Sequence, residues 1–240
     1  MDYPLLGPQH DIPQFAQPEP EALQDTTNGP DRKRYEWTYQ RDAGAAQYDR
    51  SFSESRRKRQ RTRRELWILE RLLSDQPTSK TLLDIPCGGG RLSAPMAART
   101  HALLEADISP AQLDLALTRN YSVTCPVGMV VSALELPLPD ESIDGVICAR
   151  LSHHLPDAKE RETLLGELLR VSKNFVIFSF TDRRSIQSIS RRIRGRALKS
   201  AAMLPEEIAA IASRYGARLD QCLTVSNLGP RHRYALLVKN

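Results

Sequence analysis

The stretch Thr81-Leu82-Leu83-Asp84-Ile85-Pro86-Cys87-Gly88-Gly89-Gly90-Arg91 decides the fold that we expect of this chain. A short apolar run ends at an acid and passes into a glycine-rich turn, which is typical of a buried strand followed by a turn and a helix. In α/β proteins this corner binds nucleotide-like ligands. Gly88 and Gly90 lack Cβ atoms, so their backbone can turn sharply and approach a ligand closely. Asp84 adds a carboxylate, which suits a ligand with a cationic or amine-bearing part.

The spacing of these glycines disfavours a dinucleotide. The fingerprint G-x-G-x-x-G would need a glycine where Pro86 stands, and the glycines fall at 88, 89 and 90 instead. A second apolar run, 101–107, ends in Asp107 and precedes Ser109, a predicted helix N-cap. An acid about twenty residues beyond the glycine turn accepts hydrogen bonds from ribose hydroxyls in Rossmann-like folds. Asp107 therefore predicts a ligand that contains adenosine.

The segment Asp84-Ile85-Pro86-Cys87-Gly88-Gly89-Gly90-Arg91 resembles motif I of the class I S-adenosylmethionine (SAM)-dependent methyltransferases, in the subgroup where Pro-Cys-Gly replaces the usual first glycine. The run 136–144 also resembles that family's connection into the fourth strand. The resemblance covers residues 48–240 and implies SAM as the cofactor. It implies an α/β fold with a doubly wound, mostly parallel seven-stranded sheet and an antiparallel C-terminal hairpin strand.

The order of the apolar runs agrees with such a sheet, because strands alternate with helices along the chain. We expect strands at 101–107, 127–133 and 174–180, with the fourth strand following residue 143. Two late strands, at 219–226 and 234–238, predict a terminal hairpin that dehydrogenase folds lack. An NAD-dependent oxidoreductase is therefore a distant alternative.

The chain divides into two parts. Residues 1–35 contain six prolines and few apolar pairs, so we expect an irregular or disordered segment. Residues 36–240 form the expected methyltransferase domain, with a basic helix at about 53–74 and a lid-like basic insertion at about 182–204. The chain has neither a long apolar run nor a basic stretch followed by an apolar one, so we expect a soluble, cytoplasmic protein without a transmembrane segment.

The resemblance also implies the cofactor-binding residues. They lie in the glycine turn, after the second, third and fourth strands, and ahead of the basic helix: Asp84, Pro86, Cys87, Gly88, Gly90, Asp107, Ile108, Ser132, Ala133, Leu134, Ala149, Arg150 and Tyr48. Most relatives carry an acid where Ser132 stands, so this chain departs from the family at the contact with the adenine N6 group.

Two histidines follow the fourth strand, at the cleft where methyl donor and acceptor would meet. The sulfonium is already activated, so the protein mainly aligns and desolvates, with a base added if the nucleophile is a hydroxyl. An imidazole titrates near neutral pH, so His153 or His154 is the candidate base. His154 is preferred, because relatives with a single histidine here place it just before the leucine. The alternative is a histidine that packs on the cofactor or caps the next helix.

Positive charge is concentrated in two segments, 56–64 and 183–199, each with seven basic residues and no acid. The chain has 34 basic residues, so removing these fourteen leaves 20 against 29 acidic residues. In the class I family both segments lie over the substrate mouth, which implies an anionic acceptor or surface. The alternative for the first segment is a solvated helix face. The candidate anion-binding residues are Arg183, Arg184, Arg191, Arg192, Arg194 and Arg196.

The expected acceptor is a small molecule or a lipid or glycolipid precursor, with peripheral contact to an anionic membrane. Nucleic acid is less favoured, because aromatic residues are 6% of the chain, so an RNA methyltransferase is a distant alternative. A SAM-fold protein that binds or regulates a protein partner, with weak or absent catalysis, remains open because of Pro86 and Ser132. The four cysteines form no C-x-x-C pair, so no metal site is expected.

Overall fold

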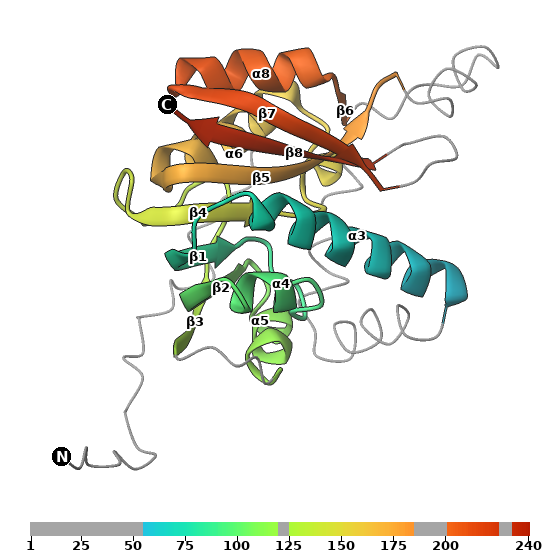
Figure 1. Ribbon diagram of the computed structural model, residues 1–240, viewed down its shortest axis with the longest axis vertical. Coiled ribbons are helices and arrows are strands. Elements are labelled where there is room, and N and C mark those ends of the chain that lie inside the picture. Colours follow the sequence, from blue (N-terminus) through green and yellow to red (C-terminus); the bar gives the residue numbers. More distant parts are fainter. Residues whose placement is uncertain (1–54, 120–124, 185–200, 226–231) are drawn as a thin grey trace, which may run out of the picture.

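The computed structural model describes residues 55–119, 125–184, 201–225 and 232–240. Their strands form one mixed sheet in the order β3-β2-β1-β4-β5-β8-β7, with β6 paired to β5 (Figure 1). The first five strands and β6 pair in parallel, and β8 runs antiparallel to both β5 and β7. The strands are β1 (Ser79–Asp84), β2 (Thr100–Asp107), β3 (Cys125–Val130), β4 (Ile143–Cys148), β5 (Ser172–Asp182), β6 (Ala202–Met203), β7 (Ala217–Thr224) and β8 (His232–Lys239).

This topology confirms the predicted fold class, a doubly wound parallel sheet closed by an antiparallel C-terminal hairpin. The structure adds an eighth strand, β6, which has two residues and pairs only with the end of β5. The third strand was predicted at 127–133, but β3 ends at Val130. The next residue, Val131, donates its backbone N–H to Asp107 O at 3.0 Å, and Ser132 and Ala133 lie in the loop that follows.

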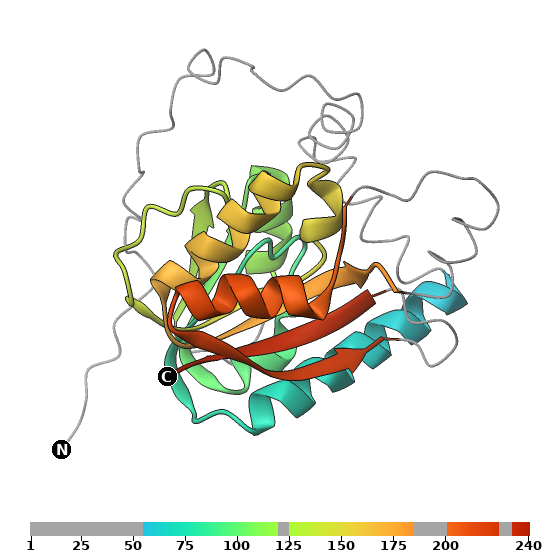
Figure 2. The same cartoon turned by 90° about the horizontal axis from the view of Figure 1, so that it is seen from above.

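Helices cover both faces of the sheet (Figure 2). Neighbouring residues of a strand point to opposite faces, so Leu82 packs with the α3 side and Leu83 with the α6 side. One face is covered by α3 (Arg56–Ser74) and α4 (Ala94–Ala97), and the other by α6 (Ala158–Val171) and α8 (Pro205–Arg214). Burial of both faces explains why the central strands read as continuous apolar runs.

Local capping fixes where the helices begin. Ser109 accepts a hydrogen bond from the Gln112 N–H at 3.3 Å, and Pro110 is the first residue of α5 (Pro110–Leu117), as the sequence predicted. The predicted basic helix is α3, where Ser55 accepts from the Lys58 N–H. After β4, the chain forms a short 3₁₀ helix, η1 (Ser152–His154), before Asp157 caps α6.

The carboxyl ends of β1, β2, β3 and β4 meet at one edge of the sheet, because these strands are parallel. That edge is where ligands bind in open α/β sheets. Within the part of the chain that the structure describes, no helix combines the length and apolar character that a membrane crossing requires.

Candidate cofactor and acceptor site

The glycine turn after β1 has a left-handed backbone at two positions. Gly88 has a φ of 53° and Gly90 a φ of 70°, a region in which residues with a Cβ are strained. In the same turn, the Cys87 N–H donates to Ala106 O at 2.8 Å, which fixes the turn against β2. A Cβ built on Gly88 would lie 3.7 Å from its nearest protein atom, Gln112 Oε1. No protein atom other than Gln112 therefore packs closely on this face of Gly88.

Asp107, at the end of β2, is held by backbone donors on both sides. Its Oδ2 accepts from the Gly88 N–H at 2.9 Å, and its Oδ1 accepts from the Ser109 N–H at 2.9 Å. Burial raises the pKa of Asp107, while the hydrogen bonds from Ser109 and Gly88 oppose that shift. Each oxygen can still accept another hydrogen bond, so the carboxylate is oriented for a ligand with hydroxyl groups.

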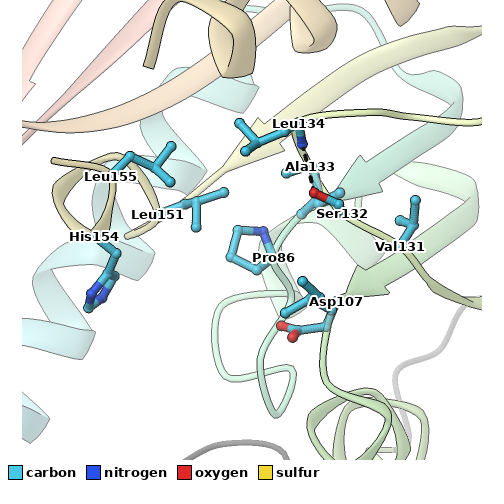
Figure 3. Close-up of a pocket in the computed structure, with 11 residues that line it drawn as sticks. Pro86, Asp107, Val131, Ser132, Ala133, Leu134, Leu151, His154 and Leu155 are labelled. Carbon is cyan, nitrogen blue, oxygen red and sulfur yellow. Dashed lines mark hydrogen bonds between the residues drawn. The ribbon is translucent and has the colours of Figure 1, made fainter. Parts of the chain in front are cut away.

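A pocket opens beside Asp107, and Figure 3 shows Pro86 between Asp107 on one side and Leu151 on the other. Seven of its eleven lining residues belong to the predicted site: Pro86, Asp107, Ile108, Ser132, Ala133, Leu134 and His154. Ser132 Oγ accepts from the Leu134 N–H at 3.3 Å, so its hydroxyl is tied to the loop after β3. The other four, Ile85, Val131, Leu151 and Leu155, were not predicted. Their only sequence signal was adjacency to predicted residues.

The remaining predicted cofactor residues lie outside this lining. Asp84 is 1% exposed and accepts from Ser93 Oγ at 2.8 Å. Cys87 and Ala149 are buried, while Gly88 meets the site through its hydrogen bond to Asp107. Gly90, the second left-handed glycine, also lies outside the lining. The predicted residue Tyr48 is outside the described residues.

Arg150 pairs with a buried acid and does not line the pocket. Its backbone is left-handed, with a φ of 64°, and its side chain donates to both carboxylate oxygens of Glu65, one of them at 3.0 Å. Glu65 is 1% exposed on α3, and Arg61 and Arg91 also lie within 3.8 Å of its carboxylate. This arginine cluster joins the basic helix to the carboxyl end of β4.

Three carboxyl groups lie near one another at the ends of β1 and β2. Asp84 of β1 is the register partner of Glu105 of β2, and Asp107 follows two residues later. Burial, with Glu105 and Asp107 nearby, raises the pKa of Asp84 well above its usual value, and burial raises the pKa of Glu105 to about 7. The Ser93 and Cys87 side chains oppose that rise for Glu105. Both side-chain polar atoms of buried Gln112 lack a hydrogen-bond partner, which makes Gln112 a candidate functional residue.

The two candidate bases differ in their surroundings. Their ring centroids are 4.0 Å apart, and His153 also contacts His232 of β8 at 5.2 Å. Burial, together with the nearby charges of His154 and His232, lowers the pKa of His153 to about 2. His154 is exposed and lines the pocket. The structure therefore brings only His154 to the pocket wall.

Two of the six predicted anion-binding arginines lie in the described part of the structure. Arg183 lies 2.9 Å from Glu207, and Arg184 lies 3.0 Å from Glu206, so acids of α8 balance both charges. The other four, Arg191, Arg192, Arg194 and Arg196, lie outside the described residues. In the described ranges, no group of three or more His, Cys, Asp or Glu side chains is arranged to hold a metal ion.

Comparison with known proteins identifies this arrangement. Residues 83–180 match the family model described as a methyltransferase domain. An uncharacterized methyltransferase-like protein of Schizosaccharomyces pombe is 30% identical over 108 residues, which span 45% of this chain and 39% of that protein. Magnesium protoporphyrin IX methyltransferase from Synechocystis PCC 6803, solved with SAM, aligns with a TM-score of 0.68 and 16% identity over 90% of this chain and 100% of that one.

A third similar protein is the N-methyltransferase NodS from Bradyrhizobium japonicum, solved with S-adenosylhomocysteine (SAH). It aligns with a TM-score of 0.58 and 15% identity over 78% of this chain and 89% of that one. The fold is thus that of the class I SAM-dependent methyltransferases. Residues 83–180 match the methyltransferase domain model, and the two solved structures hold SAM or SAH, in agreement with the predicted family and cofactor.

The residues present also fit that cofactor chemically. The left-handed Gly88 carries no side chain in the turn, and Asp107 offers acceptors for hydroxyl groups. Gln112, whose side-chain polar atoms have no partner, and the acids Asp84 and Glu105 lie around the same turn, where a ligand carrying positive charge would meet carboxyl groups. A pyrophosphate would meet those carboxyl groups with charge of the same sign.

Proposed function

We propose that this chain transfers a methyl group from SAM to an anionic small-molecule or lipid-precursor acceptor. The observation that carries this proposal is Asp107, held by the Gly88 and Ser109 N–H groups in the wall of the pocket. When bound, the cofactor supplies a methyl group already activated by its sulfonium. The protein then has to bind, orient and exclude water rather than create a reactive group.

In this proposal, a polar residue of the pocket wall binds the ribose and apolar residues bind the adenine. Asp107 would accept hydrogen bonds from the ribose hydroxyls. Ile108, Ala133 and Leu134 would pack against the adenine, and the Ser132 hydroxyl stands where most relatives have an acid. A hydroxyl is a weaker acceptor than a carboxylate, so we expect the adenine to be held mainly by apolar contact.

His154 is the residue that we propose as base when the acceptor is a hydroxyl. It lines the pocket, whereas the low pKa of His153 keeps that imidazole neutral and weakly basic at neutral pH. In this proposal His154 takes a proton from the acceptor oxygen, and His153 packs behind it at 4.0 Å. An amine acceptor that is already neutral would not need this step.

An anionic acceptor is proposed because the positive charge of the chain lies in two segments. Arg61, on the first of these, lies 3.5 Å from Glu65 of the arginine cluster, which also includes Arg150, two residues before η1. The cluster holds three guanidinium groups around one carboxylate. An acceptor that carries a carboxylate or phosphate suits this end of the site.

The test begins with the purified protein. Mass spectrometry of the protein as isolated, and calorimetric titration with SAM and SAH, should show cofactor binding. Incubation with methyl-labelled SAM and fractionated anionic metabolites or lipid precursors should then transfer label, and His154→Gln should slow transfer to a hydroxyl acceptor without a change in cofactor affinity. Binding without turnover of any acceptor would favour the regulatory alternative, and absence of binding would refute the proposal.

A further inference from the structure

Glu105 is a buried acid for which the proposed chemistry has no use. It is 1% exposed on β2, where its register partner on β1 is Asp84. Burial raises its pKa, and Ser93, whose hydroxyl donates to Asp84, and the Cys87 thiol only partly oppose that rise. Burying a carboxyl group with so little compensation costs free energy, so a purely structural role would be better served by an apolar residue.

The charges around Glu105 point towards the glycine turn. The Cys87 thiol, which lies in the turn, is affected by Asp84, Glu105 and Asp107, and its pKa is raised by burial and by all three carboxyl groups. Gln112 of α5, whose side-chain polar atoms have no partner, lies beside Gly88. Of the basic residues, Arg119 beyond α5 favours the ionised form of Glu105, and Arg91 favours that of Asp84. Acids therefore surround the glycine turn, and Glu105, with a pKa of about 7, ionises near neutral pH.

We propose that Glu105 makes this site prefer the positively charged cofactor SAM over its neutral product SAH. This inference rests on the proposed function. SAM carries a sulfonium, which becomes an uncharged thioether in SAH once the methyl group has left. A buried carboxylate near the turn attracts the sulfonium of SAM but not the uncharged thioether of SAH. It therefore favours the binding of SAM and the release of SAH.

The expected size follows from Coulomb's law. With an effective dielectric constant of about 20, which also describes buried sites, two unit charges about 12 Å apart change affinity by roughly tenfold, and closer charges change it more. The effect requires an ionised carboxyl group at Glu105 or its register partner Asp84. Binding of a positive ligand favours that ionisation, so the preference should grow as pH rises towards neutrality.

The first experiment measures SAM and SAH affinities by calorimetry at pH 7 for the wild type and for Glu105→Gln. Glutamine has the same shape without the charge. We expect SAM affinity to fall about tenfold and SAH affinity to change less than about twofold. Sinefungin, which carries an amine in place of the sulfonium, should behave like SAM. Asp114→Asn, which removes an exposed charge from α5, is the matched control and should change neither affinity.

The second experiment uses the wild type and does not depend on a variant that folds. The ratio of SAM to SAH affinity should rise between pH 5.5 and pH 7, below the range in which the ligand amino group titrates. His154 also lines the pocket, so the same titration with His154→Gln separates the two groups. The rise should persist in His154→Gln and be much smaller in Glu105→Gln.

Two outcomes would overturn the inference. One is an equal SAM to SAH affinity ratio in wild type and folded Glu105→Gln, and the other is a wild-type ratio that does not change with pH. Both would leave the proposed function standing, because both ligands still bind. A wild type that binds neither ligand would refute the proposed function itself, and this inference with it.

Discussion

Each oxygen of Asp107 already accepts one backbone N–H, so its carboxylate is oriented before a ligand arrives. Asp107→Ala removes both acceptors that the ribose hydroxyls would use. We expect SAM and SAH to bind more weakly by about 1.5–3 kcal/mol, the range for hydrogen bonds to a charged group. Calorimetry should show an equal loss for both ligands, because they share the ribose. Unchanged affinity in a folded Asp107→Ala would remove Asp107 from the cofactor site.

Gly88 and Gly216 share a left-handed backbone but differ in what surrounds them. Their φ values are 53° and 68°, and nothing lies within 4 Å of a Cβ built on Gly216. Alanine at either position should lower the free energy of unfolding by about 1–2 kcal/mol through backbone strain. Only Gly88→Ala should also weaken SAM binding, because its Cβ enters the space where ligand meets turn. If Gly216→Ala weakened SAM binding equally, general destabilisation would explain both.

The raised pKa of Glu105 should make the free energy of unfolding depend on pH. Between its ordinary pKa of 4.5 and its folded pKa of about 7, the folded state binds more protons, so this group's contribution to stability falls as pH rises through that window. Glu105→Gln lacks this loss, so its free energy of unfolding at pH 8 should exceed that of wild type by about 3 kcal/mol.

Urea denaturation at pH 5, 6, 7 and 8 measures that difference. The lowered pKa of His153 acts in the opposite direction, because the unfolded state binds more protons below pH 6.5. Since His153 is present in both proteins, its effect cancels when wild type and Glu105→Gln are compared. A stability difference that did not grow with pH would mean that Glu105 has no such penalty in the folded state.

At the scale of elements, α3 is anchored through one buried acid. Glu65 receives Arg150 and lies within 3.8 Å of Arg61 and Arg91, so Glu65→Ala would leave three guanidinium groups without their shared carboxylate. We expect a loss of about 3–5 kcal/mol in the free energy of unfolding. Glu70→Ala, on an exposed position of the same helix, should change it by less than about 0.5 kcal/mol. Equal losses in the two variants would show that the cluster does not anchor α3.

Local chemistry made several elements predictable. Ser109 and Pro110 correctly predicted the start of α5, and the apolar runs predicted the order of the strands along the chain. The end of β3 was predicted too late, because Val131 to Ala133 continue an apolar pattern while the chain turns away after bonding to Asp107. The short strand β6 exists only through its pairing with β5, a contact that no local pattern contains.

The site was predictable only where motif residues point into the pocket. Glu105 reads as one polar residue in an apolar strand, and only the strand register places it beside Asp84. The pairing of Arg150 with Glu65 joins residues 85 positions apart, so the sequence assigned Arg150 to the cofactor with no sign of this partner. Similarly, the contrast between His153 and His154 depends on burial by distant elements such as β8.

At the scale of the molecule, positive charge is held on the outer face of α3. Arg56, Arg57 and Arg63 are exposed there, and Arg64 lies 4.1 Å above the ring of Trp67, which is 47% exposed. By contrast, Arg183 and Arg184 are balanced by acids of α8. A basic face that also displays an aromatic ring suits the headgroup region of an anionic membrane.

Replacing Arg56, Arg57 and Arg63 together by glutamine should therefore weaken binding to phosphatidylserine-containing vesicles. Each basic residue near such a surface contributes about 1 kcal/mol, so the triple variant should lose about 3 kcal/mol, and SAM affinity should not change. Raising the salt should weaken wild-type binding as well, because screening acts over about 8 Å at physiological ionic strength. Arg183→Gln with Arg184→Gln is the control with paired charges and should lose much less. Vesicle sedimentation that was insensitive to salt, or equal for wild type and the triple variant, would make the charge on α3 a solvated helix face and confine the search for an acceptor to soluble molecules.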